Sequence, residues 1–148
     1  MGQEKVLIIG LGEIGHTLFA LLSEAKESLA VYGLDLDQAK MVALGQSKDR
    51  GPSKIDTLHV CLPSNNQKRF AEVVAAYVNQ FKQKLTIINS TVPPGTTLKV
   101  DDKCKCLIAH SPARGVHKSA EHMIWENEAV DQICWRHKCN CGEKAGAF

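Results

Sequence analysis

The sequence predicts an α/β domain with a doubly wound parallel sheet between two layers of helices. Short apolar segments, typical of strands buried on both faces, alternate with segments whose apolar residues recur at helical spacing. A glycine-rich loop stands between the first strand and the first helix, and an acidic residue follows about twenty positions later, at the end of the second strand. Together these features are typical of a Rossmann-type, three-layer αβα fold.

The first part of the chain contains two strand–helix units. Residues 6–9 form an unbroken apolar run, and the apolar residues that follow share one face of a predicted helix. The second strand begins at Leu29 and ends at Asp35. Asp37 is the expected N-cap of the second helix, and Gly45 stands where a helix commonly ends.

The alternation continues to about residue 109. We predict a loop at residues 46–54, with room for a vestigial edge strand, followed by a strand at 57–62 and a helix at 70–81. A strand at 85–88, a turn at 93–95 and a last strand at 106–109 complete the alternation. Residues 1–118 therefore form the predicted Rossmann domain. For residues 119–148 we predict a helix that ends near Cys134, followed by a cysteine-rich tail without a clear pattern.

Composition excludes several classes of protein. The 148 residues suit one domain, and scattered Lys and Arg with a net charge of only +2 argue against nucleic-acid binding. The apolar runs are too short to span a membrane and no export signal is visible, so we expect a cytoplasmic protein with reduced thiols. The cysteines of the last third, with His137, are a weaker candidate for zinc because their spacing lacks the common Cys-x2-Cys pair; they are Cys104, Cys106, Cys134, Cys139 and Cys141. We expect no metal site.

The loop from Gly10 to Gly15 has the Gly-x-Gly-x-x-Gly spacing of a dinucleotide site. Gly10 would permit the tight turn, Gly12 would let the backbone approach a pyrophosphate, and Gly15 would allow close packing of helix on strand. The N–H groups of the helix N-terminus would face the phosphates, which brings Glu13 and Ile14 into the predicted site. The alternative interpretation is that the glycines only form a tight turn.

Asp35 would accept hydrogen bonds from both ribose hydroxyls of the adenosine. A carboxylate there repels a 2′-phosphate, so we predict NAD rather than NADP as the cofactor. Asp37 is a second candidate for the ribose role, although its simpler interpretation is a helix cap.

Residues 88–97, read as Ile-Asn-Ser-Thr-Val-Pro-Pro-Gly-Thr-Thr, resemble one segment of the UDP-glucose/GDP-mannose dehydrogenases. Residues 60–64 are similar to a strand end of that family, and the glycine loop and residues 31–37 also fit. The resemblance covers roughly residues 5 to 110 and is most specific at the Ser-Thr-Val-Pro-Pro-Gly turn.

This resemblance implies roles for matching positions. Leu62, Pro63 and Ser64 would lie beside the adenosine and pyrophosphate, and Ser90 and Thr91 near the nicotinamide half. The family's threonine helps to position a catalytic water, which makes Thr91 a catalytic candidate. The plainer interpretation of the Pro-Pro-Gly sequence is a rigid turn.

The sequence also departs from the family. The family's nucleophilic cysteine segment and lysine have no match, and we expect the chain to be too short for a sugar-binding domain. His110, Ser111, Arg114 and His117 could instead form a pocket for a small anionic substrate. In this pocket Arg114 would bind a phosphate or carboxylate, and His110 would act as acid or base. An exposed polar loop is the alternative.

Three functions fit the sequence. The first is a stand-alone NAD-binding domain similar to that of nucleotide-sugar dehydrogenases, either as a reduced oxidoreductase that shares its site with another subunit or as a remnant. The second is a non-catalytic nucleotide sensor or regulatory subunit. The third is another short Rossmann oxidoreductase, such as one similar to prephenate dehydrogenase. The expected partners are a dinucleotide and a second copy or partner subunit.

Overall fold

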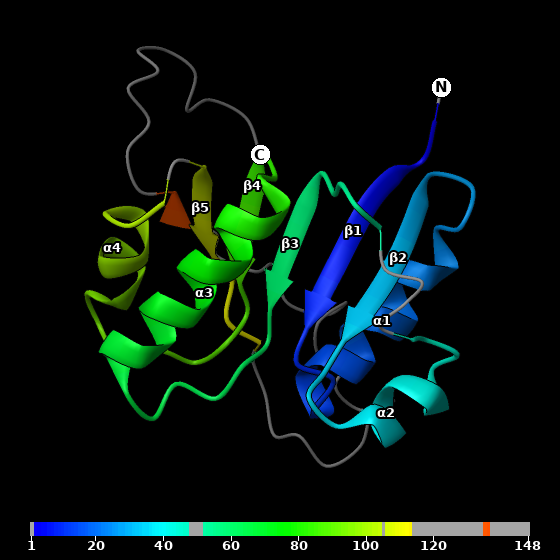
Figure 1. The fold of residues 1–148 in the computed structure, drawn as a ribbon, viewed down its shortest axis with the longest axis horizontal. Helices are drawn as coiled ribbons and strands as arrows, with labels where there is room; N and C mark the ends of the chain where they lie inside the picture. The colour runs from blue at the N-terminus through cyan, green and yellow to red at the C-terminus, as the bar shows by residue number, and fades with distance from the viewer. Residues whose placement is uncertain (1, 48–51, 105, 114–134, 137–148) are drawn as a thin grey trace.

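The computed structural model describes residues 2–47, 52–104, 106–113 and 135–136 (Figure 1). Strands and helices alternate along most of this chain, as the sequence predicts. In order, the elements are β1 (Glu4–Ile9), α1 (Glu13–Glu24), β2 (Leu29–Leu34), α2 (Gln38–Ala43), β3 (Thr57–Val60), α3 (Gln67–Phe81), β4 (Leu85–Ile88), α4 (Thr96–Asp101), β5 (Leu107–His110) and β6 (Trp135–Arg136).

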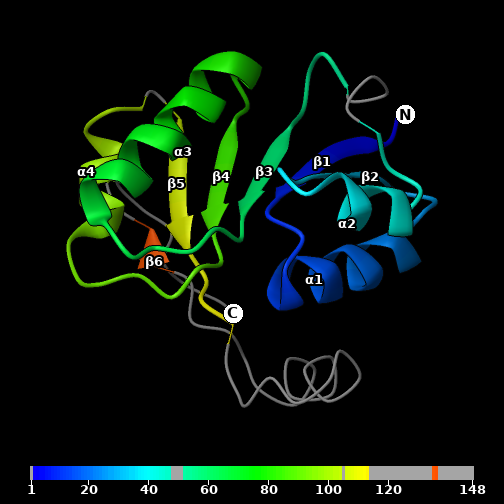
Figure 2. The ribbon, with the colours of Figure 1, turned by 60° about the horizontal axis from the view of Figure 1, so that its bottom comes forward.

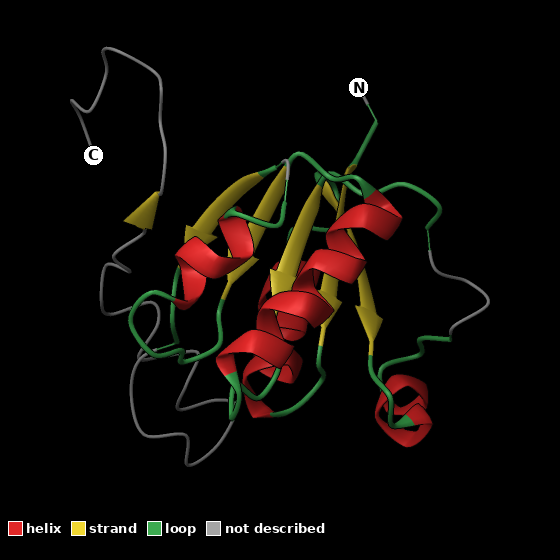
Figure 3. Cartoon of the chain, turned by 60° about the vertical axis from the view of Figure 1, so that its left-hand side comes forward, coloured by secondary structure: helices red, strands yellow, loops and turns green. Residues whose placement is uncertain are grey.

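The strands form one sheet in the order β2-β1-β3-β4-β5-β6. The first five are parallel, with their arrowheads toward the same edge in Figure 3, and the short β6 pairs antiparallel with β5. The chain moves outward from β1 to β2 and then returns past β1 to β3. The predicted doubly wound sheet is confirmed, and its topological switch point lies between β1 and β3.

Alternate side chains of the strands pack against helices on opposite faces of the sheet. Leu7 and Ile9 of β1 belong to the larger core, which contains buried residues of α3 and Val100 of α4. Ile8, between them, packs instead with Met41 of α2 and with partly buried residues of α1. Figure 2 shows α3 and α4 beside β4 and β5, and α1 and α2 beside β1 and β2. This arrangement confirms the three predicted layers.

Helix caps explain several of the boundaries. The Asp37 side chain accepts a hydrogen bond from the N–H of Ala39 at 2.9 Å, so the predicted N-cap of α2 is confirmed. Gly45 follows that helix with a φ of +66°, as expected of a glycine after a C-terminus. Asn66 caps α3 in the same way, by accepting from the N–H of Arg69 at 3.0 Å.

Two elements were not predicted. Helix α4 follows the Pro-Pro-Gly turn, where a left-handed Gly95 starts the helix and the Thr96 hydroxyl donates to the carbonyl of Pro93 at 2.7 Å. Its six residues are too few for a helical period to be recognised, and two threonines and a valine favour strands. The two-residue β6 lies just after the predicted helix of the C-terminal part, most of which lies outside the described residues.

The third strand is shorter than predicted. It ends at Val60 rather than at residue 62, although the N–H of Cys61 still donates to the carbonyl of Ile9 at 2.9 Å. Beyond this bond the chain leaves the sheet and forms the loop that leads to α3. Cys61 therefore lies just past the carboxyl end of β3 rather than inside the strand.

Candidate functional site

The glycine loop after β1 is built around two very close backbone contacts. Gly10 has a φ of +84°, and a Cβ atom there would lie 2.4 Å from the carbonyl oxygen of Cys61. A Cβ atom on Gly15 would lie only 1.8 Å from the carbonyl oxygen of Gly10. The turn and the close approach of α1 to the loop therefore both need glycine, as predicted.

Gly12 has different surroundings. A Cβ atom at this position would meet nothing within 4 Å. Gly12 is also the N-cap of α1, where no side chain caps the helix. The first turn of this 12-residue helix therefore has no side-chain cap, and a free helix N-terminus is the arrangement that binds phosphate groups.

Asp35 follows β2 and is tied directly to the glycine loop. Its carboxylate accepts hydrogen bonds from the N–H of Leu11 at 2.6 Å and from the N–H of Asp37 at 2.8 Å. The ammonium of Lys40 lies 4.0 Å away, and the Asp35 side chain is 14% exposed. Burial alone would raise the pKa of Asp35, but the backbone hydrogen bonds and Lys40 outweigh it and lower that pKa below its ordinary value. The carboxylate is therefore held ionised beside the loop.

A cavity of about 530 Å³ opens at the carboxyl ends of β1, β3 and β4. This is the place where open α/β sheets bind ligands, next to the switch point. Most of the predicted cofactor residues line it, together with two that were not predicted, Cys61 and Asn65. The full lining is Gly12, Glu13, Ile14, Cys61, Leu62, Pro63, Ser64, Asn65, Ser90 and Thr91.

Hydrogen bonds between neighbouring loops hold the far wall of this cavity together. The Ser64 hydroxyl donates to the carbonyl of Thr91 at 2.6 Å, and the Ser90 hydroxyl donates to the carbonyl of Val60 at 3.2 Å. At the base of the wall, Gln67 donates to the carbonyl of Pro94 at 3.3 Å and accepts from Lys99 at 2.5 Å. These contacts give Ser64 and Ser90 a second role, in positioning the loops.

A second cavity, of about 380 Å³, lies on the other side of the loop after β3. It shares Leu62, Pro63 and Asn65 with the first cavity, so one stretch of chain forms a wall of both. Leu36, which is 90% exposed, lies at its edge just after Asp35. The position beside the predicted ribose site and the mainly apolar lining suit a flat aromatic base. Asn66, Arg69, Phe70 and Val73 of the α3 region complete the lining.

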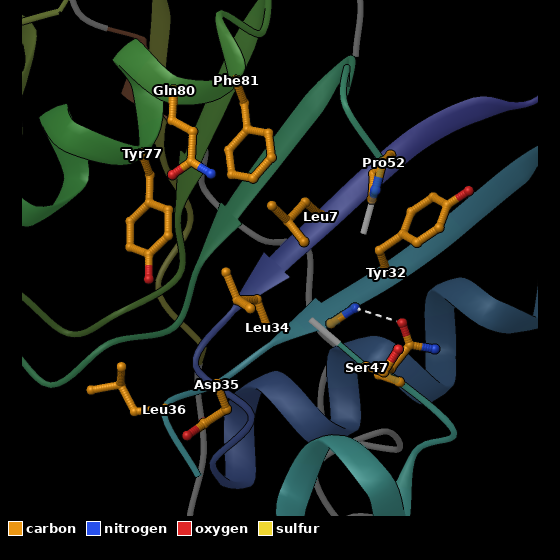
Figure 4. A pocket seen from close by; sticks show the side chains of 12 residues that line it. Leu7, Tyr32, Leu34, Asp35, Leu36, Ser47, Pro52, Tyr77, Gln80 and Phe81 are labelled. Atoms are coloured by element: carbon orange, nitrogen blue, oxygen red, sulfur yellow. Dashed lines mark hydrogen bonds between the residues drawn. The ribbon is translucent and has the colours of Figure 1, made fainter. Parts of the chain in front are cut away.

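A third hollow, of about 400 Å³, lies over β1 and β2 beside α3 (Figure 4). Its lining includes Leu7 and Tyr32 from the strands and Tyr77 and Phe81 from α3. Asp35 stands at one end of this hollow. The sequence pattern did not indicate it, because its lining residues come from segments far apart in the chain.

The catalytic candidates have different positions. Thr91 is exposed and lines the first cavity. His110 is half-buried behind the cavity, with its Nε2 atom 3.1 Å from the carbonyl oxygen of Ser90. Ser111 is buried, with its carbonyl accepting from Asn89 at 2.9 Å. Arg114 and His117 lie outside the described residues.

A buried polar chain next to the site was not predicted. The Nδ1 atom of His59 lies 2.8 Å from the amide oxygen of Asn89, and the amide nitrogen of Asn89 donates to the carbonyl of Ser111. Burial lowers the pKa of His59, and the Asn89 contact only partly opposes this effect. This chain links the ends of β3, β4 and β5 under the cavity. An isolated polar residue within an apolar run was its only signal in the sequence.

The described cysteines are held as thiols. Burial raises the pKa of Cys61 to about 12 and that of Cys104 to about 11, and it also raises the pKa of Cys106. A thiol of this kind is a poor nucleophile. In the part of the chain that the structure describes, no three His, Cys, Asp or Glu side chains come together as metal ligands. The remaining candidate zinc ligands, His137, Cys134, Cys139 and Cys141, lie outside that part.

Among the described residues no helix is both long and apolar enough to cross a bilayer.

No known protein family matches the sequence, and no curated protein sequence matches it. Its fold is similar to those of solved dehydrogenases. UDP-glucose dehydrogenase from Pyrobaculum islandicum is 18% identical with a TM-score of 0.61, over 93% of this chain and 41% of that one. For 3-hydroxyisobutyrate dehydrogenase from Mycobacterium tuberculosis the identity is 20% and the TM-score 0.58, over 79% and 43% of the two chains.

Prephenate dehydrogenase from A. aeolicus, solved with hydroxyphenyl propionate and NAD+, is 17% identical with a TM-score of 0.59, over 78% of this chain and 44% of that one. The chain therefore spans less than half the length of each of these three structures. The fold defines the class of the protein, which is a Rossmann-type domain like those of dehydrogenases of several kinds.

Proposed function

We propose that the chain is an NAD-binding Rossmann domain. The observation that carries this proposal is the open space at Gly12, above the uncapped N-terminus of α1, within a cavity at the sheet's switch point. In this proposal each part of the site takes one part of the dinucleotide. Asp35 would hold the adenosine ribose, the second cavity the adenine, the α1 N-terminus the pyrophosphate, and the first cavity the nicotinamide half.

The nicotinamide would supply hydride transfer, and the protein would supply binding and orientation. Of the candidate catalytic groups, Thr91 lines the cavity, where it could hold a water. His110 does not line the cavity but contacts the carbonyl of Ser90, which does. The high thiol pKa of Cys61 at the same cavity argues against covalent catalysis through this cysteine. The second candidate function, a nucleotide-sensing subunit without turnover, needs no such nucleophile.

The Ser90–Thr91 turn beside the cavity supports the finer proposal that the domain is related to nucleotide-sugar dehydrogenases. A small anionic substrate bound through Arg114, a cytoplasmic location and a second copy or partner subunit belong to the same proposal. The test of this ancestry is hydride transfer with a panel of nucleotide sugars.

Calorimetric titration with NAD and NADP tests the main proposal. We expect NAD to bind at least about tenfold more tightly, a difference of roughly 1.4 kcal/mol, because a 2′-phosphate would face the Asp35 carboxylate. Asp35→Ala should narrow this gap. Asp37→Ala tests the second ribose candidate: because the Asp37 carboxylate caps α2, this variant should leave the preference unchanged, and a narrowed gap would assign the ribose role to Asp37 instead. Equal affinities in the wild type would remove Asp35 from the ribose site, and no binding of either nucleotide would overturn the proposal.

A further inference from the structure

Glu13 is the only charged side chain among the described residues that line the first cavity. It occupies the first turn of α1, immediately after Gly12, and is exposed. Glycine-rich loops bind phosphate through backbone groups, so a carboxylate at this position does not serve that purpose. An acidic residue in the first turn stabilises a helix N-terminus, and at this position it also adds a negative charge to the lining of the cavity.

Within the described part of the chain, no hydrogen bond or ion pair to another side chain neutralises this carboxylate. Three cationic side chains that could pair with Glu13 have other positions in the structure. Lys40 lies beside Asp35, Lys99 donates to Gln67, and Arg69 lines the second cavity. Glu13 therefore contributes the one formal charge among the described residues that line the first cavity.

The proposed binding mode determines which part of the ligand that is. Asp35 and the second cavity take the adenosine, and the α1 N-terminus takes the phosphates. The remaining half of the dinucleotide must then extend away from Asp35, past Glu13 and toward Ser90 and Thr91. The oxidised nicotinamide ring carries one positive charge and the reduced ring none, whereas the rest of the two molecules is identical.

From this juxtaposition we infer that Glu13 makes the site select the oxidised cofactor over the reduced one. The carboxylate attracts the nicotinamide cation and gains nothing from the neutral reduced ring. Its repulsion of the phosphates is the same for both forms, so it cancels in the ratio of the two affinities. The inference rests on the proposed NAD binding and adds that occupancy of the site reports the oxidation state of the nicotinamide pool.

The test compares dissociation constants for NAD+ and NADH in the wild type, in Glu13→Gln and in Glu24→Gln. Glu24 is exposed at the far end of the same helix, so its variant changes net charge equally without touching the cavity. We expect Glu13→Gln to reduce the preference for NAD+ by about three- to fivefold, the range of an exposed ion pair. Glu24→Gln should keep the wild-type ratio. Added salt should reduce the preference in the wild type and have little effect on it in Glu13→Gln.

A thermal melt of each variant shows that it is folded before binding is measured. An unchanged NAD+ to NADH ratio in folded Glu13→Gln would overturn the inference, and so would an equal gain in affinity for both forms. Either result leaves the proposed NAD binding intact. Failure of the wild type to bind both NAD+ and NADH would instead overturn the proposed function itself.

Discussion

At the scale of single residues, the three glycines of the loop differ in the space around them. Gly15 is packed against the carbonyl of Gly10, whereas Gly12 faces open space. The sequence predicts separate roles for them from spacing, and the structure shows close backbone contacts at Gly10 and Gly15 but open space at Gly12. If the loop binds the pyrophosphate as proposed, substitutions at Gly12 and Gly15 should separate ligand binding from stability.

We predict that Gly12→Val remains folded and loses nucleotide binding, because the new side chain would occupy the space of the pyrophosphate. Gly15→Val is the matched variant, in which the side chain collides with backbone and should lower the free energy of unfolding by about 1–3 kcal/mol or more. Denaturant unfolding and a binding titration of both variants provide the measurements. Wild-type affinity in folded Gly12→Val would exclude the loop as the phosphate site.

The lowered pKa of Asp35 predicts a pH dependence of stability. A carboxyl group whose pKa is lower in the folded than in the unfolded state stabilises the fold fully at pH values above its unfolded-state pKa. For Asp the unfolded-state pKa is about 3.9. This stabilisation is lost as the pH falls through the folded-state pKa. The difference in unfolding free energy between wild type and Asp35→Asn should thus be larger at neutral pH than at strongly acidic pH. A difference that grows on acidification would contradict the sign of the pKa shift.

At the scale of elements, the sequence predicts what has a long period or a distinctive turn. The 15-residue α3, with five buried residues at helical spacing, is recognisable in this way. Helix α4 is not, because its Thr96 and Thr97 favour strands and its stability comes from tertiary contacts. The polar links between loops, such as Ser64 to Thr91, join residues far apart in the chain and leave no local signal.

If tertiary packing stabilises α4, two substitutions in it should differ. Val100 is fully buried in the main core, and Leu98 is 40% exposed on the same helix. Val100→Ala should lower the free energy of unfolding by about 2 kcal/mol, since it leaves a cavity. Leu98→Ala should change it by less than about 0.5 kcal/mol. Chemical denaturation measures both, and equal losses would show that helix propensity rather than core packing controls this element.

At the scale of the whole molecule, the doubly wound parallel sheet follows from the predicted alternation of strands and helices, whereas the strand order is known only from the structure. The third hollow beside Tyr32 and Tyr77 could not be predicted, because its lining residues come from segments far apart in the chain. The candidate catalytic residues divide in the same way. Thr91 lines the first cavity, whereas His110 does not line it and contacts the carbonyl of Ser90. Spacing predicts which loops meet at a strand end but not which side chains reach the ligand.

For the molecule as a whole, we predict that the isolated chain does not oxidise UDP-glucose to the acid. In the family that the sequence resembles, this reaction needs a thiolate beside the nicotinamide. Cys61 borders the cavity, but burial raises its pKa to about 12. NADH absorbance should stay flat with nucleotide sugars. Two NADH formed per UDP-glucose, and lost on alkylation of the thiols, would show that a cysteine outside the described residues acts as nucleophile.

The wall of Leu62, Pro63 and Asn65 that the two cavities share has a consequence for how binding energy accumulates. In the proposed binding mode each half of a dinucleotide would have its own compartment, and the covalent link between the halves would make entry of the second half intramolecular. Short links of this kind correspond to an effective concentration in the millimolar range. Separate mononucleotides gain no such advantage, so their weak individual affinities would understate what the same two compartments achieve with the joined molecule.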